Sequence, residues 1–145
     1  MLSSKNKEKI YIKCIEGVKS TSESNKLKFI SKLLFESFDN WIFCGFYFQE
    51  NDKLLVSEYS ANKIPCSPIE FNGVCGTAIL KNKILNIEDI NTFQGHIVCD
   101  NDSKSELCIP FDIDGIKYVL DVDSNIYNAF CEIDERYLVK IIKEI

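Results

Sequence analysis

Apolar residues recur at helical spacing near both ends of the chain. Between residues 24 and 38 they fall three or four positions apart, and a weaker stripe of the same kind covers residues 5–19. The spacing returns over residues 133–145. Because a period of about 3.6 residues places such side chains on one side of a helix, these three segments are predicted to be amphipathic helices.

The middle of the chain carries the pattern of strands instead. Residues 41–48 (WIFCGFYF) are rich in aromatic side chains, which favours a buried strand, and residues 54–56 return after an Asn-Asp turn as its hairpin partner. The other predicted elements are a short helix at 73–80 and strands at 84–87, 107–111 and 117–122. Strands in the middle and helices at the ends predict an α+β fold, with helices from both termini on one face of a mostly antiparallel sheet.

Length and charge narrow the class of protein. The 145 residues suffice for one domain, expected to span residues 1–145, and no Pro/Gly/Ser-rich linker divides them. The net charge of -5 disfavours nucleic acid as a partner, since phosphate binding needs clustered Lys and Arg. No apolar run approaches the ~18 residues of a membrane span, and no signal-peptide core follows the charged N-terminus. We therefore expect no membrane partner and a cytoplasmic location.

The cysteine content is unusually high, with seven in the chain, and an odd number cannot all pair within one molecule. In a reducing compartment most of them should be thiols. Four fall in apolar stretches and are predicted to be small buried residues: Cys14, Cys44, Cys108 and Cys131. No Cys-x-x-Cys pair occurs, and His96 three residues before Cys99 is a weak metal signal. No metal is expected, and a structural zinc domain is the least favoured hypothesis.

Two other cysteines lie in polar or glycine-containing surroundings. Cys99 falls within residues 91–105, the longest stretch without periodicity, and such loops often carry function. Cys75 precedes it by 24 residues and is followed directly by Gly76. This pair predicts a redox-active thiol in an intracellular enzyme.

Four motifs give the chain a resemblance to a known family. They are GVCGTA at 73–78, FQGHIVCD at 93–100, SKSELCIP at 103–110 and VLDVDS at 119–124. In this order they resemble the free methionine-R-sulfoxide reductases, which are single GAF-domain enzymes. The resemblance covers about residues 25–145. It implies a GAF-like α+β fold and an oxidoreductase that converts free L-methionine-(R)-S-oxide to methionine.

The resemblance assigns roles to three thiols. Cys99 corresponds to the catalytic cysteine, which attacks the sulfoxide sulfur and becomes a sulfenic acid. Cys66 corresponds to the resolving cysteine, which converts that sulfenic acid to a disulfide, and Cys75 to an auxiliary thiol. Here Cys66 and Cys75 are nine residues apart, one fewer than in the family. No bound cofactor is implied, because a thioredoxin-type protein or another dithiol restores the thiols.

The acidic residues form the second part of the implied site. Glu106 and Asp123 correspond to the pair that holds the sulfoxide, and Asp121 corresponds to the carboxylate that binds the substrate ammonium. A sulfoxide oxygen leaves only when it is protonated, and a carboxylic acid can supply that proton. Two carboxylates in one small pocket repel each other, so we expect one of them to have a raised pKa and to stay protonated.

The remaining substrate contacts are apolar. Ile97 and Val98 precede the catalytic cysteine, where the substrate binds in the family, and an aromatic residue of the first strand covers the substrate methyl group. Trp41, Phe43 and Tyr47 are predicted to share one face of that strand, since residues two apart point the same way. Phe43 stands where the family has Trp, and either Trp41 or Phe43 is a candidate for the methyl contact.

Other interpretations stay open from sequence alone. Asp121 and Asp123 alternate along a strand and share a face, and strand carboxylates are usually just solvated. A GAF module that binds a small molecule or senses redox state without catalysis is the alternative function, because a fold does not fix a function. Relatives of this kind often dimerise through terminal helices, and the sequence leaves the formation of a homodimer open.

Overall fold

A five-stranded antiparallel sheet forms the centre of the structure, a computed structural model that describes residues 2–95 and 100–145. Its strands, in chain order, are β1 (Trp41–Glu50), β2 (Lys53–Ala61), β3 (Leu85–Ile87), β4 (Ser105–Ile113) and β5 (Ile116–Ser124). They lie side by side in the order β2-β1-β5-β4-β3, and every neighbouring pair is antiparallel. The predicted strands are therefore confirmed, and β5 lies at the centre of the sheet.

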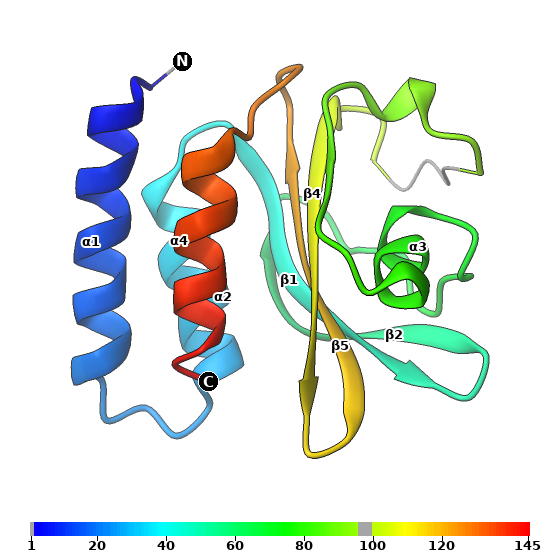
Figure 1. The fold of residues 1–145 in the computed structure, drawn as a ribbon, viewed down its shortest axis with the longest axis horizontal. Coiled ribbons are helices and arrows are strands. Elements are labelled where there is room, and N and C mark those ends of the chain that lie inside the picture. Colours follow the sequence, from blue (N-terminus) through cyan, green and yellow to red (C-terminus); the bar gives the residue numbers. More distant parts are fainter. Residues whose placement is uncertain (1, 96–99) are drawn as a thin grey trace.

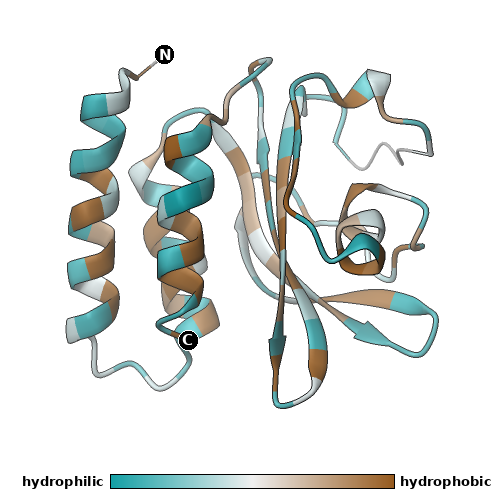
Figure 2. Cartoon of the chain, viewed as in Figure 1, coloured by the Kyte–Doolittle hydropathy of each residue, from teal (hydrophilic) through white to brown (hydrophobic). Residues whose placement is uncertain are grey.

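Three helices lie on one side of this sheet. Helices α2 (Lys26–Ser37) and α4 (Glu132–Ile142) pack on the sheet, and α1 (Ser4–Ser20) packs against both of them, whereas the short helix α3 (Val74–Lys81) packs on the opposite face (Figure 1). Hydrophobic and hydrophilic residues alternate along α1 and α4, as expected of helices that bury only one side (Figure 2). The sheet thus separates a helix-covered core from a second apolar cluster that α3 helps to cover.

A buried ion pair joins the first and last helices. The Lys7 ammonium lies 2.6 Å from the Asp134 carboxylate, and the Tyr11 hydroxyl donates a 2.6 Å hydrogen bond to the same group. The Asp134 carboxylate also accepts a 2.7 Å hydrogen bond from the Cys131 backbone N–H, which opens α4. Asp134 is fully buried, so this charge depends on its partners.

A β-bulge at the start of β1 reverses the side chain of Trp41. The pairing of β1 with β5 shifts register between Trp41 and Phe43. Phe43 and Tyr47 face α3, but Trp41 packs in the helix-covered core, with its ring 4.4 Å from that of Phe38. The prediction that Trp41 shares a face with Phe43 and Tyr47 is wrong, because the period of two fails where a bulge inserts an extra residue.

The long polar segment before β4 was predicted to be a loop, and the structure adds one short element to it. A 3-10 turn, η1, covers Ile90–Thr92. The predictions for Cys99, Ile97 and Val98 fall outside the described residues. None of the helices in the described ranges is both long and apolar enough to cross a membrane.

Candidate functional site

A pocket lies on the sheet face that carries α3. Residues of β1, β4 and β5 line it together with the N-terminal end of α3 and the segment between β2 and α3. Six residues predicted from the sequence line it: Phe43, Tyr47, Cys75, Glu106, Asp121 and Asp123. Antiparallel pairing explains this convergence, because Glu106 on β4 lies directly opposite Asp123 on β5.

The environment of the three acids in the pocket favours their neutral, protonated forms. Burial is the first cause that raises the pKa of Glu106 well above its ordinary value, and the Asp121 carboxyl adds to it. The pKa of Asp121 is raised by burial and then by Asp123, and that of Asp123 by burial and then by Glu106. The predicted raised pKa of paired carboxyls is confirmed, and it extends to all three.

One carboxylate oxygen of the pocket has no hydrogen-bond partner. Asp123 Oδ1 is buried and unpaired among the described residues. A buried oxygen without a donor costs free energy unless a ligand or water satisfies it. The pocket therefore presents an acceptor to whatever enters it.

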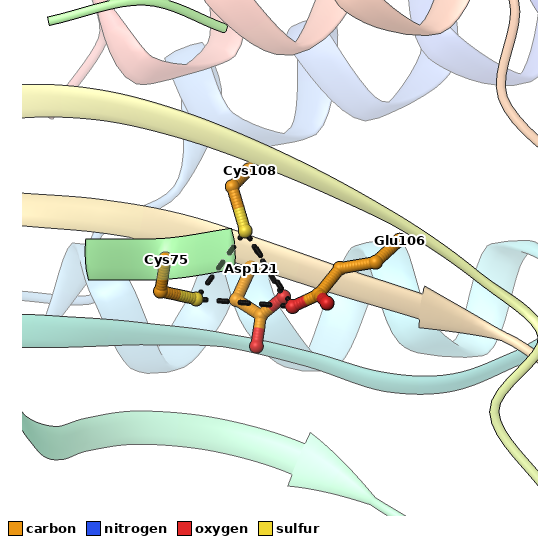
Figure 3. A group of neighbouring side chains, drawn as sticks. All are labelled: Cys75, Glu106, Cys108 and Asp121. Atoms are coloured by element: carbon orange, nitrogen blue, oxygen red, sulfur yellow. Dashed lines mark hydrogen bonds between the residues drawn. The ribbon is translucent and has the colours of Figure 1, made fainter. Parts of the chain in front are cut away.

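Two buried thiols lie beside these acids (Figure 3). Cys75 Sγ is 3.3 Å from Cys108 Sγ and 3.8 Å from Glu106 Oε2. Cys108 Sγ is in turn 3.5 Å from both Glu106 Oε2 and Asp121 Oδ1. All four side chains are buried, and their donor atoms lie within 4.8 Å of one another, so this group could hold a metal ion.

Both of these thiols are protonated in their resting state. Burial raises the pKa of Cys108 well above its ordinary value, and the neighbouring Cys75 raises it further. At Cys75 the hydrogen bond with Cys108 lowers the pKa, but burial and the nearby carboxyls outweigh it and the net direction is upward. Cys75 is therefore a poor nucleophile, which agrees with an auxiliary role rather than a catalytic one.

Sequence reasoning missed the polar surroundings of Cys108. The residue is buried as predicted, yet its thiol contacts two acids rather than apolar side chains alone. The available signal was the strand period, which places Cys108 on the same face as Glu106 two residues earlier. Cys14 and Cys44 are buried as predicted, whereas Cys131 is only half-buried, at the N-cap of α4.

Cys66 lies in the irregular segment between β2 and α3, at the side of the pocket. Its backbone carbonyl accepts a 2.9 Å hydrogen bond from the Tyr47 hydroxyl, which ties this segment to β1. Cys66 is disulfide-bonded, in contrast to the five described free thiols. Burial raises the pKa of Tyr47, so its hydroxyl stays a hydrogen-bond donor.

The close approach of α3 to the preceding segment requires a glycine. A Cβ atom on Gly76 would lie 2.3 Å from the backbone of Phe71, closer than any side chain allows. The glycine after Cys75 therefore lets α3 dock against the pocket and brings that thiol to the sheet. This explains why the GVCGTA motif needs Gly76 for its geometry.

A positively charged side chain at the rim of the pocket, Lys63, was not among the site residues predicted from the sequence. Lys63 lines the pocket and forms ion pairs with Asp100 at 3.3 Å and Asp102 at 3.5 Å. The lysine is exposed and precedes the strand β4 by some forty residues, so no local pattern links it to these acids. Trp41, by contrast, does not line this pocket.

The fold and this site together define a GAF domain. A solved structure described as the GAF domain matches with a TM-score of 0.85 at 28% identity, covering 99% of this chain and 90% of that chain. The predicted GAF-like α+β fold is therefore confirmed. No protein-family model matches the chain.

Similar proteins narrow the family further. Protein YtsP of Bacillus subtilis (strain 168) is 46% identical over 113 residues, which are 76% of this chain and 69% of that protein. The free methionine-R-sulfoxide reductase of Escherichia coli (strain K12) is 38% identical over 117 residues, 79% of this chain and 70% of that protein. The X-ray structure of free methionine-R-sulfoxide reductase from Neisseria meningitidis in complex with its substrate matches with a TM-score of 0.85 at 28% identity, covering 99% and 89% of the two chains. The chain belongs to the free methionine-R-sulfoxide reductase family of oxidoreductases.

Proposed function

We propose that this chain reduces free L-methionine-(R)-S-oxide to L-methionine, using cysteine thiols as the source of electrons. The observation that carries the proposal is the pocket lined by three acids, the buried Glu106 and Asp121 and the half-buried Asp123, in a member of this family. A neutral carboxylic acid at neutral pH is the group needed to protonate a sulfoxide oxygen.

Glu106 is the proposed proton donor. Its burial and its acidic neighbours keep it protonated at the pH where the thiol chemistry takes place. Asp121 and Asp123 line the same pocket and are the proposed ligands of the substrate ammonium and sulfoxide groups. The unpaired Oδ1 of Asp123 supports this assignment, because a bound donor would satisfy it.

Two cysteines carry out the proposed redox steps, and an external dithiol regenerates them. The Cys99 thiolate attacks the sulfoxide sulfur while Glu106 protonates the sulfoxide oxygen. That oxygen passes as a hydroxyl group to the Cys99 sulfur as the bond between the two sulfurs and the S–O bond of the substrate break, so methionine leaves and Cys99 becomes a sulfenic acid. Cys66 then attacks that sulfur, releasing water and forming a disulfide. An external dithiol of the thioredoxin type supplies two electrons and two protons to regenerate both thiols. The disulfide-bonded state of Cys66 supports its role as the resolving thiol.

The apolar part of the site receives the substrate methyl group in this proposal. Phe43 and Tyr47 form an aromatic wall, with ring centroids 6.1 Å apart, and Phe43 also stacks on Tyr59 at 6.0 Å. Phe43 rather than Trp41 therefore covers the methyl. Ile97 and Val98 remain proposed substrate contacts on the basis of the family resemblance.

The test is turnover of racemic free methionine sulfoxide with a thioredoxin system or a dithiol, followed by chiral chromatography of the remaining epimers. Selective loss of the R epimer is expected, together with loss of activity in Cys99→Ser. Glu106→Gln should lower kcat by about 10²–10⁴-fold, because it can no longer donate a proton. Glu50→Gln, at the exposed end of β1, is the matched control and should be fully active. Binding of methionine sulfoxide without consumption of either epimer would contradict the proposal.

A further inference from the structure

We propose that Cys75, Glu106, Cys108 and Asp121 form a binding site for a thiophilic divalent cation of the zinc type, at the inner end of the pocket. Cys108 is the residue that creates this site, because it places a second sulfur beside Cys75 and both acids (Figure 3). The reduction proposed above does not use Cys108.

The spacing of the four donor atoms fits a tetrahedral ion. Zinc binds sulfur at about 2.3 Å and carboxylate oxygen at about 2.0–2.2 Å, so in a tetrahedron two sulfurs are about 3.8 Å apart and a sulfur and an oxygen about 3.6 Å apart. The sulfur–oxygen distances of 3.8, 3.5 and 3.5 Å fit these values, whereas the Cys75 and Cys108 sulfurs, which are 3.3 Å apart, must separate by about 0.5 Å. All four donor atoms lie within 4.8 Å of one another, so small side-chain rotations suffice to surround one ion.

The surroundings of the cluster also favour a cation. Within residues 2–95 and 100–145, no Lys or Arg side chain pairs with any of the four ligands. The neighbouring Asp123 adds a buried oxygen without a donor. A divalent ion would supply two positive charges as the two bound thiols and the two bound carboxylic acids release their protons to water.

The donor types select the kind of ion. Two sulfur ligands favour zinc and similar soft or borderline ions, whereas magnesium and calcium prefer oxygen alone. The set has no place for a large hydrated ion, since all four side chains are buried. A protein thiol pair with two carboxylates is thus a site for zinc or cobalt rather than for magnesium.

The position of the site has a consequence for activity, and this part rests on the proposed function. Glu106 and Asp121 are both proposed to act on methionine sulfoxide, so an ion held by them excludes the substrate and removes the proton donor. Zinc is therefore expected to inhibit competitively with methionine sulfoxide. The pocket therefore cannot hold zinc and reduce methionine sulfoxide at the same time.

The experiment is titration with Co²⁺ as a spectroscopic probe, and then with Zn²⁺, of full-length protein in which the Cys66 disulfide is intact. Cobalt bound by two thiolates gives a sulfur-to-metal charge-transfer band, which Zn²⁺ should abolish by displacement. Cys108→Ala should weaken binding by more than about 10–100-fold, the loss typical when a residue that merely supports a ligand is removed. Cys75→Ser gives a second, independent loss of one thiolate. Cys131→Ser, which removes a thiol far from the pocket, should leave the band unchanged.

The outcomes separate this inference from the proposed function. Absence of the cobalt band, or an equal band in Cys108→Ala, overturns the metal site, whatever the reductase assay shows. A two-thiolate band that free methionine sulfoxide displaces supports both the site and its overlap with the substrate pocket. A band that methionine sulfoxide leaves unchanged overturns the competitive inhibition and also removes Glu106 and Asp121 from the proposed substrate site.

Discussion

Three neighbouring carboxyl groups decide how the protein responds to pH. An Asp side chain in an unfolded chain titrates near pH 4, and burial raises the pKa of folded Asp121 well above that value. The folded state therefore holds a proton that the unfolded state has already lost. Stability is fully present below about pH 4 and falls as pH rises toward the folded pKa.

Asp121→Asn should flatten this pH dependence. The asparagine keeps an oxygen at the Cys108 hydrogen bond but cannot ionise, so the free energy of unfolding should fall less between pH 5 and pH 8 than in the natural chain. Each unit by which the pKa of Asp121 is raised is worth about 1.4 kcal/mol. Urea unfolding at both pH values measures it, with the exposed Asp112→Asn as control. If the free energy of unfolding of Asp121→Asn and that of the natural chain change equally with pH, the pKa of Asp121 is not raised in the folded state.

Among individual residues, the positions of the acids in the site could be predicted from the sequence, but the contacts of the Cys108 thiol could not. The strand period placed Asp121 and Asp123 on one face, and their shared pocket follows from that period. The polar role of Cys108 depends instead on how α3 docks against β4, which brings the Cys75 sulfur to 3.3 Å from the Cys108 sulfur. No local pattern in the sequence encodes this docking, because Cys75 and Cys108 are 33 positions apart.

At the scale of elements, the bulge in β1 determines which aromatic residue faces the substrate pocket. The helices begin and end close to the predicted positions. Helix α2, for example, was expected at residues 24–38 and covers Lys26–Ser37. The bulge was not predictable, because it arises from the pairing of β1 with β5 about eighty residues away. Trp41 consequently faces Phe38 and Phe130 instead of Phe43.

Substitutions on the two sides of the bulge should therefore separate binding from stability. Phe43→Ala removes the pocket wall and should raise KM for methionine sulfoxide by about tenfold, the worth of about 1.4 kcal/mol of contact. Trp41→Phe should leave KM unchanged and lower the free energy of unfolding by about 1–2 kcal/mol, since its ring fills the helix-covered core. Steady-state kinetics and urea unfolding of both variants check the assignment. A raised KM in Trp41→Phe would return that residue to the substrate pocket.

For the molecule as a whole, the ion pair of Lys7 with Asp134 fastens the N-terminal helix to the C-terminal one. Both side chains are almost completely buried, and the contacts between α1 and α4 span the full length of the sequence. Each residue lies on the buried face of its helix, Lys7 with Tyr11 and Asp134 with Tyr137, but this spacing does not indicate which partner either charge meets. The fold brings together a lysine and an aspartate that the sequence separates by 127 positions.

Lys7→Ala should destabilise the whole molecule without touching the pocket. Removing one partner of a buried ion pair leaves an unpaired charge, which costs about 3–5 kcal/mol. Chemical denaturation of Lys7→Ala against Lys9→Ala, whose side chain is exposed on the same helix, measures the difference. Equal stability of the two variants would mean that solvent or Tyr11 alone satisfies Asp134.

The pocket is built partly from the central strand β5 and partly from the irregular connection that carries Cys66, and these two parts differ in how well they tolerate insertions and deletions. Asp121 and Asp123 belong to a strand with a neighbour on each side, so an insertion near them would displace backbone pairing with both β1 and β4. Cys66 belongs to a connection outside the named strands, where a residue can be gained or lost without shifting the sheet. The interval between Cys66 and Cys75, nine residues here, lies within such a connection. We therefore expect relatives of this chain to keep the acids of β5 in register and to differ in the length of the segment that carries Cys66.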